Sequence, residues 1–305
     1  MKKSILISLV SIMMPMLASA QALPFVAADY DPSTVAKGGA SAVQTSSTAY
    51  SAFHNPAAVP FAQQKMDVAA GFAMWAPDGV STNVISVGGA YNMNQKLGIT
   101  AGLAYGMNPA YDVTDASGVS KGKFKPTEMQ LKAGVSYRFL PFLSVGANVG
   151  YASSKLAEGA SYGSLDADVF LMAKFGGVKV AAGVSDLGGG VTSASGAKFA
   201  LPAAGVLGVG YETVMAQKHG IEVQADADYY FAGAFAAALG ASYTYDDMIS
   251  VRAGYRAGAE SVIPSFLSLG AGVKFARAKL DLAYLIGAGD SPVGNTLALS
   301  LGYSF

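Results

Sequence analysis

The chain has 305 residues, and its twenty basic and twenty acidic residues give a formal net charge of zero. Only 13% of the residues are charged, 52% are apolar, 37 are glycine and none is cysteine. This composition excludes intrinsic disorder, disulfides and thiolate metal sites, and the absence of a basic stripe argues against nucleic acid as a partner.

Residues 1–20 have the features of a secretory signal peptide. Lys2 and Lys3 form a positive start, an apolar stretch follows, and Ala18-Ser19-Ala20 matches an A-x-A cleavage site. We therefore expect export, with Gln21 as the first mature residue and an uncleaved membrane anchor as the alternative. The rest of the chain contains no apolar run long enough for a membrane helix.

Residues 21–65 lack sustained alternation and contain Gly38-Gly39 and the motif Asn55-Pro56-Ala57. The segment is too small for a typical domain, and it is apolar enough that a free tail would expose many of its side chains. We expect the strand-rich part of the chain that follows to enclose a lumen, and this segment to enter that lumen as a hatch or plug rather than to form a free tail. Because proline restricts the preceding residue to extended backbone, Asn55-Pro56 should form the turn that leads into the first strand. A direct role of these residues in ligand binding is the alternative.

Fourteen segments of period-2 alternation fill residues 66–305. Most have the length that a tilted strand needs to cross a bilayer, roughly nine to twelve residues. They begin near Met66, Val84, Leu97, Glu128, Leu143, Ser164, Val178, Ala203, Gly220, Ala236, Ile249, Phe266, Lys279 and Thr296.

The two faces of these segments differ in a way that is typical of a membrane barrel rather than of a soluble β-sandwich. Strand charges share the Gly/Ser face, and the opposite face is apolar with aromatic residues at both ends. Connections alternate between short and long, and we expect the long loops at residues 108–127, 155–162, 187–202, 257–265 and 286–295. The even strand count brings Phe305 back to the side with short turns. We predict an all-β, fourteen-stranded antiparallel transmembrane barrel in a bacterial outer membrane.

Ten charged residues should form a polar network in the lumen. We interpret it as ion pairs that fill the barrel and hold the hatch, with a path for a charged solute as the alternative. The residues are Lys132, Arg138, Asp166, Asp168, Glu222, Asp226, Asp228, Arg252, Arg256 and Lys274.

Enzyme and metal signatures are missing from the pattern. Asp166-x-Asp168 and Asp226-x-Asp228 lack the glycine and terminal glutamate of an EF-hand, so we expect no metal site. No nucleophile motif of the G-x-S-x-G kind occurs, and neither His54 nor His219 looks like a catalytic base. We predict no catalytic residues, no cofactor and no enzymatic activity.

The N-terminal motifs resemble the start of the FadL-like outer-membrane barrels, most closely their PorV/PorQ branch. The resemblance rests on a Gly/Ala run at residues 35–43 and the stretch Phe53-His54-Asn55-Pro56-Ala57. It implies a fourteen-stranded barrel with an N-terminal hatch. Thr45-Ser46-Ser47-Thr48 stands where the family usually has one or two aspartates. The ending at Tyr303 and Phe305 resembles the insertion signal of such barrels, which implies the barrel-assembly machinery, outer-membrane lipid and lipopolysaccharide as partners.

Two functions follow from this resemblance. The first is a non-enzymatic accessory for type IX-like protein secretion or surface assembly, with secretion components or cargo as partners, and the short external loops favour it. The alternative is a FadL-like channel for hydrophobic small molecules or fatty acids. That channel needs an apolar pocket, which Phe25, Phe53, Phe61, Phe170 and Met172 would line. A hatch disfavours a simple diffusion porin.

Overall fold

The computed structural model describes residues 22–75, 82–193, 196–258, 262–287 and 293–305. The predicted signal peptide and Gln21 lie outside the described residues. Within them, no helix is long and apolar enough to cross a membrane.

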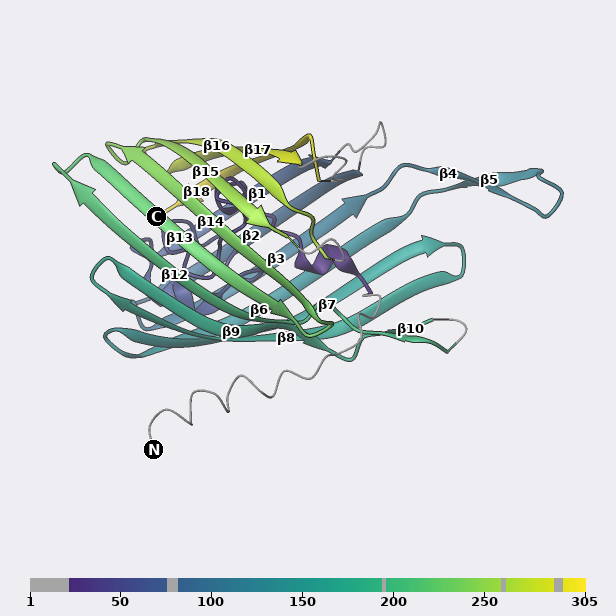
Figure 1. Ribbon diagram of the computed structural model, residues 1–305, viewed down its shortest axis with the longest axis horizontal. Coiled ribbons are helices and arrows are strands. Elements are labelled where there is room, and N and C mark those ends of the chain that lie inside the picture. The colour runs from purple at the N-terminus through teal and green to yellow at the C-terminus, as the bar shows by residue number, and fades with distance from the viewer. Residues whose placement is uncertain (1–21, 76–81, 194–195, 259–261, 288–292) are drawn as a thin grey trace.

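Fourteen antiparallel strands form a closed barrel, which confirms the predicted fold class and strand number (Figure 1). Each strand pairs with its neighbour around the ring, and the first strand pairs with the last. The Met66 amide donates to the Phe305 carbonyl at 2.6 Å, and the Phe305 amide donates back to Met66 at 2.9 Å. The strands are β1 (Met66–Trp75), β2 (Thr82–Met93), β3 (Leu97–Met107), β6 (Thr127–Leu140), β7 (Leu143–Ala157), β8 (Ala160–Phe175), β9 (Val178–Gly188), β12 (Ala204–Met215), β13 (His219–Tyr230), β14 (Ala234–Tyr245), β15 (Ile249–Ala257), β16 (Phe266–Phe275), β17 (Ala278–Gly287) and β18 (Thr296–Ser304).

One end of the barrel, which we name the turn end, carries the short connections and Phe305. Asn94 and Gln95 have φ of 53° and 54°, and Asp246 and Asp247 have φ of 53° and 55°. Two consecutive residues in this left-handed region form a tight turn whose twist matches that of the two strands it joins. Among residues other than glycine, asparagine and aspartate adopt this conformation most readily. The sequence therefore sets the hairpin geometry at this end.

The opposite end, the loop end, differs from the sequence-based expectation in two places. Residues 108–127 are not one loop, because β4 (Tyr111–Thr114) and β5 (Ser120–Phe124) form a hairpin that projects beyond the barrel (Figure 1). Residues 155–162 are not a long loop either, since β7 and β8 continue to a turn at Glu158 and Gly159. A second small hairpin, of β10 (Val191–Thr192) and β11 (Lys198–Phe199), also belongs to this end.

Alternation sends apolar side chains outward and polar side chains into the lumen. Leu165 and Val149 on the outer face are 71% and 68% exposed, whereas Lys132 and Lys179 on the inner face are at most 1% exposed. An apolar outer band of this kind suits a surrounding lipid, because a charge there would lose its hydration.

The N-terminal residues 22–65, which we call the N-terminal segment, lie inside the ring of strands (Figure 1). The segment contains three short helices, η1 (Pro24–Ala27), α2 (Pro32–Val35) and η2 (Pro56–Phe61). Nearly all side chains from Pro32 to Val43 and from Pro56 to Ala62 are buried. The lumen therefore contains much of the apolar core of the molecule.

Candidate functional site

Inward-facing glycines let the N-terminal segment lie directly against the barrel wall. A Cβ added at Gly254 would lie 2.1 Å from the Gly38 nitrogen, and one at Gly88 would lie 2.4 Å from the Ala49 carbonyl oxygen. Both distances are shorter than any real carbon contact, so only glycine leaves room for the segment at these positions. This close approach explains a part of the high glycine content.

The motif residues of the segment fix its backbone. The Asn55 side chain accepts from the Ala57 amide at 2.8 Å and donates to the Ala42 carbonyl at 2.7 Å. It thereby caps η2 at Pro56, and Asn55 itself is extended, with φ of −130°. Gly38 and Gly39 have φ of 74° and 76°, a conformation that favours glycine.

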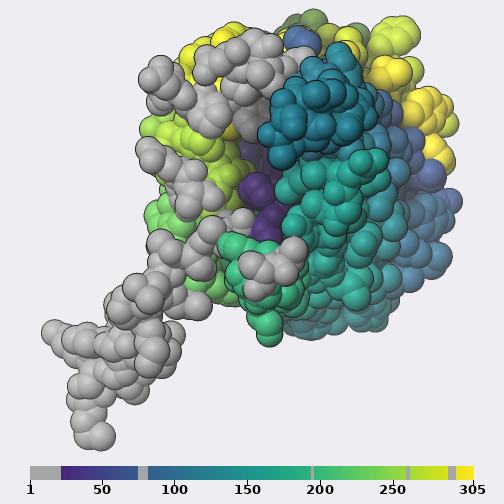
Figure 2. Space-filling view, turned by 90° about the vertical axis from the view of Figure 1, so that its right-hand side faces the viewer, coloured from purple at the N-terminus to yellow at the C-terminus, as the bar shows by residue number. Residues whose placement is uncertain are grey.

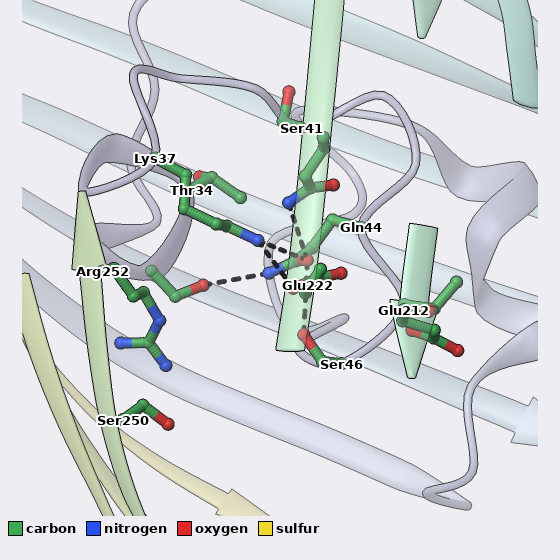
Figure 3. Close-up of polar contacts among 12 residues, drawn as sticks. Thr34, Lys37, Ser41, Gln44, Ser46, Glu212, Glu222, Ser250 and Arg252 are labelled. Atoms are coloured by element: carbon green, nitrogen blue, oxygen red, sulfur yellow. Dashed lines mark hydrogen bonds and ion pairs between the residues drawn. The ribbon is translucent and has the colours of Figure 1, made fainter. Parts of the chain in front are cut away.

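A first polar cluster joins the segment to β13 and β9. Figure 3 shows Lys37 and Gln44 of the segment beside Glu222 of β13. Lys37 donates to Gln44 at 2.9 Å and pairs with Glu222 at 3.1 Å. Glu222 also pairs at 2.7 Å with Lys179, which reaches Glu212 at 3.0 Å. Burial lowers the pKa of Lys37, and the neighbouring Glu222 carboxylate only partly offsets this effect. The cluster links the segment to the wall through charge-assisted hydrogen bonds.

A second cluster surrounds the ammonium of Lys132. It lies 3.2 Å from Asp166, 2.9 Å from Asp168 and 2.7 Å from Asp186. Carboxylate oxygens of these three aspartates lie within 4.8 Å of one another, which is a spacing that could hold a metal ion. Here the lysine ammonium takes that central position, and Asn148 links Asp168 to the Ala52 carbonyl of the segment.

A third cluster lies at the wall next to the segment's glycine turn. Arg256 donates to Asp228 at 2.7 Å and to the Tyr230 hydroxyl at 3.1 Å. Asp226 makes no ion pair among the described residues, and instead accepts from the Ser41 and Ala42 amides at 2.6 Å and 2.9 Å.

The remaining predicted network residues lie apart from these clusters. Arg252 pairs with Asp281 at 2.7 Å. The guanidinium carbon of Arg138 lies 5.5 Å from the centroid of the Phe61 ring. Lys274 pairs with Asp247, which lies in an exposed turn. The ten residues thus form several separate groups, not one continuous network.

A cavity of about 540 Å³ lies in the loop-end part of the lumen, between the N-terminal segment and the barrel wall. Figure 2 looks onto the loop end and shows atoms of the segment at the bottom of this hollow, ringed by strands. Most of its lining is apolar, and the rings of Phe25, Phe53 and Phe170 contribute to it. The cavity has the size and character of a site for a small hydrophobic molecule.

Two of the five residues expected around an apolar pocket lie elsewhere. Phe25, Phe53 and Phe170 line the cavity, whereas Phe61 and Met172 belong to a packed cluster with Ala58. Met172 is completely buried there. Phe170 and Met172 share the inner face of β8, and period-2 alternation gives that face but not the depth along the barrel. Phe61 ends η2, outside the strands, where alternation gives no information.

Sequence reasoning missed a half-buried pair within the segment, Asp29 and His54. The His54 Nε2 lies 2.8 Å from the Asp29 carboxylate, and Thr34 donates to the same carboxylate at 2.5 Å. Burial acts to lower the pKa of His54, but the Asp29 charge and hydrogen bond raise it above 6.5 overall. Burial likewise acts to raise the pKa of Asp29, and His54 holds it below 3.8. Both residues line the cavity.

Two further groups were missed, Asp31 and Asp186. Burial and the nearby Asp29 charge raise the pKa of Asp31 to about 6. Asp186 escaped notice because a bulge breaks the pairing between Ala167 and Val169, and Asp186 lies there with φ of 56°. At such a bulge, alternation no longer tells which way a side chain points.

Comparisons with known proteins bear on the fold. No family model matches the chain, and no curated protein shows a significant match. Among solved structures, the toluene transporter TodX of Pseudomonas putida has a TM-score of 0.62 at 13% identity, over 95% of this chain and 99% of that chain. The toluene transporter TbuX of Ralstonia pickettii has a TM-score of 0.60 at 11% identity, over 90% and 97%.

A FadL homologue of Pseudomonas aeruginosa has a TM-score of 0.53 at 13% identity, over 90% of this chain and 98% of that chain. Identities this low establish a shared fold and nothing finer. The first two neighbours are named as toluene transporters and the third as a FadL homologue, and this chain, a closed barrel of fourteen strands, shares their fold.

Proposed function

We propose that the protein is an outer-membrane channel for small hydrophobic molecules, with residues 22–65 as a hatch in its lumen. The observation that carries this proposal is the mostly apolar cavity of about 540 Å³ in the loop-end part of the lumen, between the N-terminal segment and the wall. A hydrophobic molecule that enters from that end meets phenyl rings before it meets the packed part of the segment.

The outer face supports a location in the bacterial outer membrane. Apolar side chains cover it along all fourteen strands, and the buried charges of the barrel point inward. A closed barrel leaves no unpaired strand edge for lipid to meet. Outer-membrane lipid and lipopolysaccharide are then the surroundings of the barrel, and the Tyr303–Phe305 ending is its insertion signal.

The channel fits the observations better than the secretion accessory does. The accessory hypothesis rested on short external connections, but the loop end carries the β4–β5 hairpin and an extended β7–β8 pair. The structural neighbours named as toluene transporters also favour the channel. Copurification of secretion components from native membranes, with no hydrophobic molecule bound, would favour the secretion accessory instead.

One matched pair of variants tests the channel. Val84→Trp places a large ring in the cavity, because Val84 lines it, whereas Val87→Trp places the same ring on the lipid-facing side of β2. We expect intact protein in lipid nanodiscs to bind toluene, Val84→Trp to lose most of that binding and Val87→Trp to retain it. Saturation-transfer NMR gives the readout. Equal binding in both variants would contradict the cavity as the site.

A further inference from the structure

The cavity wall is acidic as well as apolar. Arg256 and His54 line it too, but each is already paired with one of the carboxylates. Asp186 shares Lys132 with two other aspartates. The carboxylates that line the cavity are Asp29, Glu128, Asp186, Asp226 and Asp228. A negative potential therefore extends into a space of low dielectric, where charge is screened little.

Glu128 is the carboxylate that has no partner. Among the described residues it makes no ion pair and no side-chain hydrogen bond, and it is only half-buried. On the neighbouring strand it faces Gly106, which has no side chain to cover it. A Cβ added at Gly106 would lie 3.3 Å from the Glu128 Oε2. The carboxylate is thus free for a ligand.

Aromatic rings of the N-terminal segment lie in the same cavity. Tyr30 and Phe53 pack edge to face with centroids 5.0 Å apart, and the Tyr30 hydroxyl donates to the Phe25 carbonyl at 2.9 Å. Burial and the nearby Glu128 charge raise the pKa of Tyr30, so the phenol stays neutral beside the carboxylate. Ring faces and a carboxylate together are what an organic ammonium group binds.

We propose that the cavity binds hydrophobic amines, with the ammonium held by Glu128 and the rings of Tyr30 and Phe53 and the apolar part held by the remaining wall. This rests on the proposed channel for hydrophobic molecules and names its preferred ligand class. A fatty carboxylate of the same size meets like charge in the cavity, and a plain hydrocarbon leaves Glu128 unpaired.

Three ligands that differ only in the head group test this preference. Phenylbutylamine, phenylbutanol and phenylbutanoate are titrated calorimetrically into the intact protein in nanodiscs of zwitterionic lipid, near neutral pH. We expect the amine to bind about tenfold more tightly than the alcohol, and the carboxylate to bind most weakly. Added salt should weaken the binding of the amine and leave the binding of the alcohol unchanged. This comparison needs no variant.

Glu128→Gln should reduce the affinity for the amine to that for the alcohol, with the affinity for the alcohol unchanged. Glu158→Gln changes an exposed carboxylate at the same end of the barrel and should alter none of the three. An amine that binds no better than the alcohol, or a Glu128→Gln variant that weakens all three alike, would overturn the amine preference but not the channel. Failure of all three to bind the unaltered protein would overturn the channel itself.

Discussion

Gly240 and Gly254 lie opposite each other on β14 and β15, where the backbone of Lys37 and Gly38 passes the wall. A Cβ at Gly240 would lie 2.3 Å from the Lys37 Cβ. In the sequence these glycines look like ordinary small residues of an inner face. Their steric role is visible only when the segment is in place, because the contact joins parts of the chain about two hundred residues apart in sequence.

Gly254→Ala should therefore loosen the N-terminal segment. The new methyl group meets backbone atoms, which cannot rotate away, so we expect a loss of about 1–3 kcal/mol in the free energy of unfolding. Guanidinium unfolding, followed by the heat-modifiable gel shift, measures it. Gly220→Ala is the control, since its nearest neighbour is the Thr244 Cβ at 3.5 Å. Equal effects of the two changes would show that the segment does not press on the wall at Gly254.

The Asp29–His54 pair gives a pH dependence whose sign can be stated. The pKa of His54 is raised above 6.5, so its stabilising contribution is complete below that value and is lost as pH rises through the raised pKa. The pKa of Asp29 is lowered below 3.8, so its contribution is lost as pH falls through the lowered pKa. The pair stabilises the segment most between these limits.

Asp29→Asn should bring the pKa of His54 below 6.5, because the burial remains and the opposing carboxylate is gone. NMR of the labelled imidazole carbons measures this pKa, and His219→Gln assigns the two histidine signals. Thr34→Val removes a hydroxyl that donates to Asp29 and should shift the pKa of His54 much less. A His54 pKa that stays above 6.5 in Asp29→Asn would show that another group holds the proton.

At the scale of single strands, alternation predicted where each of the fourteen begins, to within four residues. It could do so because the lipid and the lumen impose opposite demands on neighbouring residues along each strand. The β4–β5 hairpin was missed because it lies beyond the barrel, where neither lipid nor lumen constrains its side chains. Residues such as Lys121 and Lys123 are exposed there. Connections longer than a turn carry no such periodic signal.

The sequence also does not show which inward-facing positions tolerate substitution. Ser268 looks like a permissive lumen residue, yet it is completely buried and accepts from the Gly38 amide at 2.9 Å. A bulky substitution there disturbs the packed segment, so Ser268→Arg would report on the packing of the segment and not on the tolerance of the lumen for charge. Thr296, in contrast, is half-buried and lines the cavity.

We expect Leu299→Arg and Thr296→Arg, both on β18, to differ in their effects. Leu299 is 39% exposed on the outer face, and an arginine in lipid costs about 2–4 kcal/mol near the bilayer centre. Thr296→Arg places the charge in the acidic cavity and should cost much less. Unfolding in lipid vesicles, with both variants under the same conditions, measures the difference. Similar losses would argue against lipid around the outer face.

For the whole molecule, the segment should decide whether the lumen conducts ions. Residues 32–62 are mostly buried inside the ring of strands, and the cavity lies beside them in the loop-end part of the lumen. Deletion of residues 22–61 should turn a protein without steady conductance in a planar bilayer into one with a large, stable conductance.

Deletion of the β4–β5 hairpin, residues 111–124, is the matched control and should leave the barrel closed. Steady conductance in the intact protein would favour a porin instead. The sequence predicted a segment in the lumen from its apolar content, and for the channel it named three phenyl rings that line the cavity, but it could not predict the size of the cavity or its place along the barrel. That space lies between residues of the segment, such as Phe25 and Phe53, and the inner faces of many strands, so its shape depends on contacts that no local sequence pattern shows.

The pairing of β1 with β18 has a consequence for the order in which the chain is assembled. The barrel cannot close until its last strand has been synthesised, and the segment precedes the first strand directly. Contacts such as Gly38 with Ser268 join residues 230 positions apart, so they form late in folding. The unclosed sheet must curve around the segment before its two edges meet. The segment would then act as an internal template, and changes to it should alter the rate of barrel closure as well as the stability of the finished protein.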